Sequence, residues 1–92
     1  MANRRTLIRH WLPIVTFCPV NHLPDLIYIE VEFDDDELHE LYAVRRRVRQ
    51  IASWKKKYME AIADEVFNSF PGCTAVTVTL AFGRHVVTRY ED

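Results

Sequence analysis

A thiol and a carboxylate stand seven residues apart in one proline-containing segment. Cys18 is followed by Pro19, and Asp25 is preceded by Pro24. Proline fixes one backbone dihedral angle, so the two prolines restrict the chain that joins the thiol to the carboxylate. A cysteine thiolate is a nucleophile, and a neighbouring group that transfers protons lets it add to a weak electrophile. The segment is a candidate for covalent catalysis, with Cys18 as nucleophile and Asp25 as proton donor.

By spacing alone a structural interpretation is the more common one, because a free cysteine is usually a small buried apolar side chain. Cys73 is expected to be a structural cysteine of this kind, since it has no acid or base nearby in the sequence. Two cysteines are poor evidence for a disulfide in a chain expected to be intracellular. The four histidines show no metal-ligand spacing, so we expect no metal site. They are His10, His22, His39 and His85.

The composition is typical of one small globular domain that spans residues 1–92. Of its 92 residues, 49% are hydrophobic and 27% charged, and only two are glycine and four proline, too few for a disordered or fibrous chain. No apolar run approaches the roughly 18 residues of a membrane span. Arg9 and His10 interrupt the first apolar stretch, so we expect no signal peptide and a cytoplasmic location.

Alternating apolar residues predict four strands, over 6–17, 26–33, 74–82 and 85–90. Pro13 predicts a break in the first strand and an irregular exit from it. Residues 17–25 carry the proline and asparagine of a loop.

Helical spacing of apolar residues predicts two helices between the second and third strands. The first begins at Glu37, where one aspartate among residues 34–36 can cap it, and joins the second at Gln50–Ser53. The second ends at Pro71-Gly72. Their apolar positions are Leu38, Leu41, Val44, Val48 and Ile51, then Met59, Ile62, Ala63, Val66, Phe67 and Phe70. The order ββααββ predicts an α+β fold, an antiparallel four-stranded sheet with both helices on one face. Such a sheet has open edges that pairing between subunits can close.

Seven of the twelve lysine and arginine residues lie in one short segment, although the net charge is only −1. A cluster that neutralises several phosphates binds RNA with strong, salt-sensitive affinity. The alternative is a solvated helix face balanced by acidic residues elsewhere. Trp54 and Tyr58, in the same segment, can stack on exposed bases, and Arg84 and His85 are further candidate contacts. The seven are Arg45, Arg46, Arg47, Arg49, Lys55, Lys56 and Lys57.

The loop from Cys18 to Asp25 resembles the active-site loop of the 7-cyano-7-deazaguanine reductase (QueF) family, which has the tunnelling fold. The resemblance implies that Cys18 is the nucleophile and Asp25 the proton donor. It also implies that Glu60, at the matching distance on the second helix, anchors the guanine-like edge of the substrate. His22, which stands where the family loop has glycine, is assigned with Glu60 to substrate binding.

The sequence departs from the reductases where they hold NADPH. The best counterpart of that segment runs from Glu40 to Arg47, with Tyr42 and Arg45 in place of its two lysines. The chain is similar instead to the short archaeal QueF-like proteins, which lack the NADPH motif. They add ammonia to the nitrile of 7-cyano-7-deazaguanine in the D-loop of tRNA and form archaeosine.

This similarity implies an amidinotransferase-type tRNA-modifying enzyme that uses ammonia and no NADPH or other cofactor. It also implies a homo-oligomer of tunnelling-fold subunits, a decamer of two pentameric ring barrels with active sites between neighbours. Two alternatives stay open. One is an NADPH-dependent nitrile reductase in which Arg45, Arg46 and Arg47 grip a nucleotide phosphate. The other is an RNA-binding module without catalytic activity.

Overall fold

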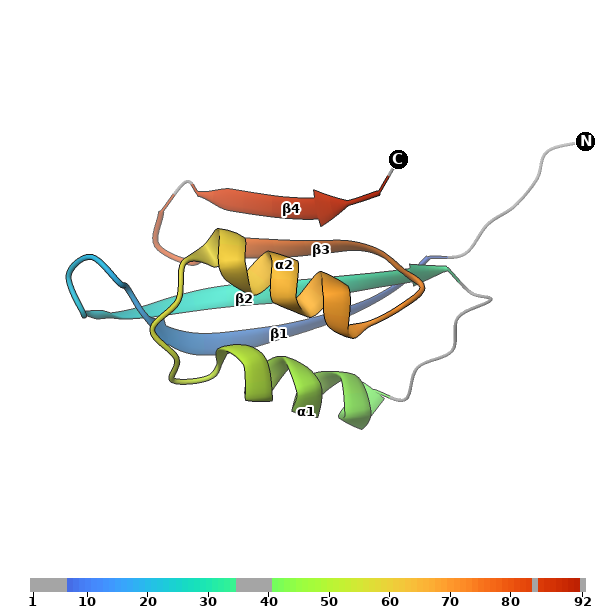
Figure 1. Cartoon of the computed structure of the whole chain (residues 1–92), viewed down its shortest axis with the longest axis horizontal. Coiled ribbons are helices and arrows are strands. Elements are labelled where there is room, and N and C mark those ends of the chain that lie inside the picture. Colours follow the sequence, from blue (N-terminus) through green and yellow to red (C-terminus); the bar gives the residue numbers. More distant parts are fainter. Residues whose placement is uncertain (1–6, 35–40, 84, 92) are drawn as a thin grey trace, which may run out of the picture.

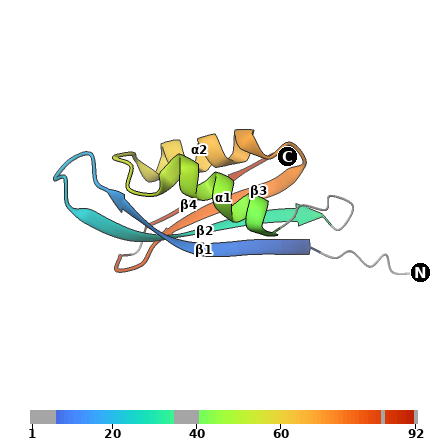
Figure 2. The same cartoon turned by 90° about the horizontal axis from the view of Figure 1, so that it is seen from below.

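The computed structural model describes residues 7–34, 41–83 and 85–91, in which a four-stranded antiparallel sheet carries two helices on one face (Figures 1 and 2). The elements are β1 (Leu7–Phe17), β2 (Pro24–Asp34), α1 (Leu41–Ala52), α2 (Met59–Ser69), β3 (Cys73–Leu80) and β4 (Val86–Tyr90). The strands lie in the order in which they occur along the chain. The predicted ββααββ architecture is thus confirmed. Neither helix has the length and apolar character needed to cross a membrane.

The predicted break at Pro13 is wrong, because β1 pairs with β2 without any shift in register, and Pro13 lies opposite Tyr28. β1 is an edge strand, and the Val15 carbonyl points away from β2 to accept a hydrogen bond of 2.7 Å from the Trp54 amide. Backbone groups alternate in direction along an antiparallel strand, so Pro13 faces the same outer edge as Val15. The N–H that proline lacks is therefore not needed for pairing with β2.

The core lies between the sheet and the helices. Every second residue of the central strands faces the helices, and the buried positions of α1 and α2 follow the predicted helical spacing. The buried apolar side chains of the strands are Leu12, Ile14, Ile27, Ile29, Val31, Phe33, Val76 and Val78. Those of the helices are Val44, Val48, Ile51, Ala52, Ile62, Ala63 and Val66, and Phe70, directly after α2, is buried with them.

The boundaries of the helices differ from the prediction at one point. α1 continues to Ala52, because burial of Ile51 and Ala52 in the core favours another helical turn. The connection is therefore residues 53–58 rather than Gln50–Ser53. The predicted helix start at Glu37 falls on residues 35–40, outside the described residues, and Asp34 is the last residue of β2.

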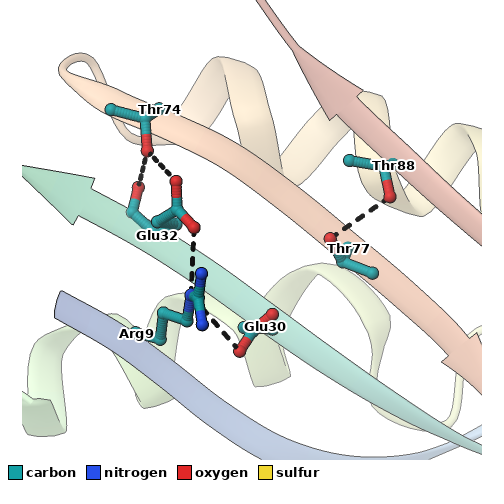
Figure 3. Close-up of polar contacts among 6 residues, drawn as sticks. All are labelled: Arg9, Glu30, Glu32, Thr74, Thr77 and Thr88. Atoms are coloured by element: carbon teal, nitrogen blue, oxygen red, sulfur yellow. Dashed lines mark hydrogen bonds and ion pairs between the residues drawn. The ribbon is translucent and has the colours of Figure 1, made fainter. Parts of the chain in front are cut away.

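The face of the sheet turned away from the helices carries a polar network (Figure 3). The Arg9 guanidinium lies 3.0 Å from one oxygen of Glu32, and the Thr74 hydroxyl donates to the other oxygen at 2.7 Å. The bond from Thr74 is the largest influence and lowers the pKa of the Glu32 carboxyl; burial, the next largest, opposes it, and Arg9 lowers the pKa further, so that it lies below its usual 4.5. The ionised carboxylate therefore links β1, β2 and β3.

We expect Glu32→Gln to reduce the acid sensitivity of the fold. Because the folded-state pKa is lowered, the carboxylate stabilises the protein above pH 4.5 and loses that effect as the pH falls through the folded-state value. Thermal unfolding from about pH 7 to about pH 3 should show a shallower loss of Tm in the variant than in the wild type. Glu30→Gln is the matched control, since Glu30 lies 4.0 Å from the same guanidinium. Equal pH slopes for wild type and Glu32→Gln would contradict this prediction.

Candidate active site

The β1–β2 loop, the α1–α2 connection and the β3–β4 turn meet at one end of the sheet (Figure 1). A cavity of about 180 Å³ lies there, on the helix side of the sheet. Its lining includes Cys18, Asp25 and Glu60, which come from the loop, from β2 and from the first turn of α2. The structure thus brings together three of the four residues predicted for catalysis and substrate binding.

Strand register brings Cys18 and Asp25 to the same cavity. Thr16 lies directly opposite Asp25, and residues paired in this way point to the same face of the sheet. Thr16 is buried beneath the helices, and Cys18, two residues on, continues in the same direction. The Cys18 amide donates to the Leu23 carbonyl at 3.0 Å, and the Cys18 carbonyl accepts from the His22 amide at 2.9 Å. These two bonds hold the backbone of the candidate nucleophile.

His22 turns the loop and does not line the cavity. Its φ is 62°, in the left-handed region that favours glycine, and its side chain is exposed. Next to it, the Asn21 side-chain oxygen accepts from the Leu23 amide at 3.0 Å, as in an Asx turn. The geometry explains why a loop of this shape favours glycine here. A role of His22 in substrate binding stays a prediction.

We expect His22→Gly to raise the Tm slightly and to leave the reactivity of Cys18 unchanged. Glycine has no penalty in the left-handed region, where other residues lose about 1–2 kcal/mol. The greater freedom of glycine in the unfolded chain offsets part of this gain in stability. His22→Ala, which removes the imidazole but keeps the penalty, should have a lower Tm than the glycine variant. Calorimetry and the rate of adduct formation at Cys18 test both. Slow adduct formation in both variants would show instead that the imidazole binds substrate.

Glu60 lies at the rim of the cavity with its side chain 61% exposed. His85, which lies just before β4, places its Nε2 3.1 Å from Glu60 Oε1. A hydrogen bond from its own backbone N–H, in the first turn of α2, and then one with His85 lower the pKa of the Glu60 carboxyl, so it is ionised at neutral pH. Sequence reasoning considered His85 only as an RNA contact. No local pattern signals a contact between residues 25 positions apart.

The basic segment divides into two groups. Lys57 lines the cavity, and its Nζ lies 2.7 Å from Glu65 Oε2 and donates to the Ile51 carbonyl at 3.0 Å. It thereby joins the end of α1 to α2. The other six have no carboxylate within ion-pair distance in the described part of the chain: Arg45, Arg46, Arg47, Arg49, Lys55 and Lys56. Arg84 lies outside the described residues.

The remaining cavity wall comes from several elements, among them the end of the α1–α2 connection and the start of α2. Tyr58 and Met59 contribute to it, with Leu80 at the end of β3. Their place in the wall depends on how the connection docks against β1, which spacing in the sequence does not show. No group of three or more His, Cys, Asp or Glu side chains gathers in a metal-binding cluster within residues 7–34, 41–83 and 85–91.

Comparison with known proteins adds information on the fold. No protein-family model matches the chain, and no curated protein shows significant sequence similarity to it. The fold matches a crystal structure of the archaeosine synthase QueF-Like in its apo form, with a TM-score of 0.70 over 95% of this chain and 94% of that one. This chain has the fold of that synthase. The sequence identity is 14%, so the likeness confirms the predicted resemblance to QueF-like proteins at the level of the fold.

Proposed function

We propose that this protein is a tRNA-modifying enzyme that adds ammonia to the nitrile of 7-cyano-7-deazaguanine in the D-loop and so forms archaeosine. The observation that carries the proposal is the shared cavity of Cys18, Asp25 and Glu60 in a fold like that of an archaeosine synthase. A thiol, a carboxyl group and a separate carboxylate are the groups that addition to a nitrile and binding of a guanine-like ring require.

The reaction needs two additions and no change of oxidation state. The Cys18 thiolate adds to the nitrile carbon, and Asp25 gives a proton to the nitrile nitrogen, which forms a thioimidate. Ammonia then adds to the same carbon, and the Asp25 carboxylate takes a proton from the incoming amine. The carbon–sulfur bond breaks, and Cys18 leaves as a thiolate. The product is an amidine, and the enzyme returns to its starting state.

Glu60 is suited to orient the base. An ionised carboxylate accepts the ring N–H and the exocyclic amine of a guanine-like edge in parallel. Each oxygen has two lone pairs, so Oε1 can keep its contact with His85 while it accepts a bond from the substrate. In this scheme His85 holds the carboxylate at the rim of the cavity that Cys18 also lines.

The proposal includes tRNA as the binding partner and a homo-oligomer as the assembly. The six cations that lack a carboxylate partner among the described residues would contact RNA phosphates. The D-loop base must leave its tertiary pairing to reach Cys18. The cavity of about 180 Å³ is smaller than typical ligand sites of about 300–1,000 Å³. A neighbouring subunit would complete it in the proposed decamer of two pentamers. Measurement of molar mass by light scattering tests that assembly.

The test uses tRNA that carries the nitrile base, with ¹⁵N-labelled ammonium and no NADPH. Mass spectrometry of the digested nucleosides should show one labelled nitrogen in the amidine. A parallel incubation with the free base and NADPH should show no oxidation of the nicotinamide. Steady NADPH oxidation would contradict the proposal and favour a nitrile reductase, and tRNA binding without any product would favour a binding module.

A further inference from the structure

Trp54 has an unusual backbone for a bulky residue. Its φ is 60°, in the left-handed region, and 66% of the residue is exposed to solvent. A large side chain in this region is a conformational outlier, which persists only where the surroundings hold it. Most of the residue stays in solvent, so burial in the folded domain explains only a part of the preference for tryptophan at this position.

The backbone around Trp54 is held against the end of β1. The Trp54 amide donates to the Val15 carbonyl at 2.7 Å, and the Phe17 amide donates to the Lys55 carbonyl at 2.9 Å. Lys56 forms a parallel bridge with Phe17. The rings of Trp54 and Phe17 lie with centroids 6.0 Å apart and planes tilted by 42°. Trp54 is therefore fixed beside the residue that precedes Cys18.

The residues that follow Trp54 in the sequence are basic, and the segment continues to the wall of the cavity. Lys55 and Lys56 follow Trp54, are exposed, and have no carboxylate partner among the described residues. Tyr58, four residues on, is 56% exposed and lines the cavity of Cys18. An exposed aromatic ring beside unpaired cations suits an unpaired nucleotide, whose base stacks and whose phosphates bind the lysines. Lysine is depleted in protein–protein interfaces, which favours RNA over a second protein here.

We propose that Trp54 is a stacking platform for an unpaired base next to the one that enters the cavity, with Lys55 and Lys56 on the adjoining phosphates. The proposal rests on the proposed function in taking RNA as the substrate. In this proposal the left-handed backbone of Trp54 serves RNA binding, because most of the residue stays in solvent while hydrogen bonds to β1 hold the chain.

Three substitutions separate RNA binding from stability. Trp54→Gly accepts the left-handed backbone but lacks the ring, Trp54→Ala lacks the ring and keeps the backbone penalty, and Trp54→Phe keeps an aromatic ring. We expect the glycine variant to have a higher Tm than the alanine variant. Its Kd for an unmodified tRNA transcript should rise about tenfold, while the phenylalanine variant stays within about threefold of the wild type.

A pair of probes tests stacking directly. Loss of affinity in Trp54→Gly should be large for a single-stranded oligonucleotide and small for a duplex of the same length, because only an unpaired base can stack on the ring. Wild-type affinity of the glycine variant for both the transcript and the single strand would overturn the proposal. A change of molar mass in that variant, with RNA binding intact, would also overturn it by showing that the ring contacts a second copy.

Failure of the platform and failure of the proposed enzyme give different results. Formation of the adduct between the free base and Cys18 does not use Trp54, so its rate in Trp54→Gly should stay within about twofold of the wild type. An absent adduct in every protein, with the tenfold RNA effect retained, would reject the enzyme and support the platform. A normal adduct with no RNA effect would reject the platform alone.

Discussion

Cys18→Ala should abolish the covalent adduct with 7-cyano-7-deazaguanine and lower formation of the amidine in tRNA by about a thousandfold or more. The wild-type protein should gain the mass of one base per chain in intact mass spectrometry. Cys18 carries the only thiol among the residues described as lining the cavity, so the alanine variant should stay at its own mass. Cys18 is only partly buried in the loop, so the variant should fold and bind tRNA as the wild type does.

Cys73→Ala is the matched control for this experiment. Burial, with a smaller contribution from Glu91, raises the pKa of the Cys73 thiol, which keeps it protonated at neutral pH. Its Sγ lies 3.6 Å from the Phe67 carbonyl, away from the cavity lining. The control variant should therefore form the adduct at the wild-type rate. An adduct that persists in Cys18→Ala, or one that maps to Cys73, would refute the proposed nucleophile.

Asp25→Asn should slow adduct formation by about 10²–10⁴-fold, because the amide cannot give a proton to the nitrile nitrogen. Asparagine has nearly the same shape, and Asp25 keeps its place opposite Thr16 in the β1–β2 ladder, so the fold should not change. Quenched-flow mass spectrometry measures the rate of the first covalent step. Release of the amidine should slow as well, since the same carboxylate takes the proton of the incoming ammonia.

The control for Asp25→Asn removes the same charge elsewhere. Asp64 on α2 lies outside the cavity lining and pairs with Arg89 at 3.4 Å across the surface. Exposed ion pairs contribute little to stability, so Asp64→Asn should keep both the fold and the rate of adduct formation. A wild-type rate in Asp25→Asn, or an equal loss in both variants, would show that Asp25 is not the proton donor.

Sequence patterns predicted most of the fold because they reflect local geometry. Ile27, Ile29 and Val31 alternate because successive strand residues face opposite sides, and Val44 and Val48 recur with the helical turn. The predicted break at Pro13 was wrong because a proline disrupts a sheet only where its nitrogen faces a neighbouring strand, and not where it faces an open edge. Only the pairing of the strands answers that question.

By itself the sequence determined the elements, the core positions and the loop that joins Cys18 to Asp25, because each depends on residues close together along the chain. Tertiary structure alone decided that His85 meets Glu60, that Lys57 turns to Glu65, and that Trp54 rests beside Phe17. These contacts arise where the loop, the connection and the last turn converge. They depend on how strands and helices pack, which sets distances in space that spacing along the chain does not encode.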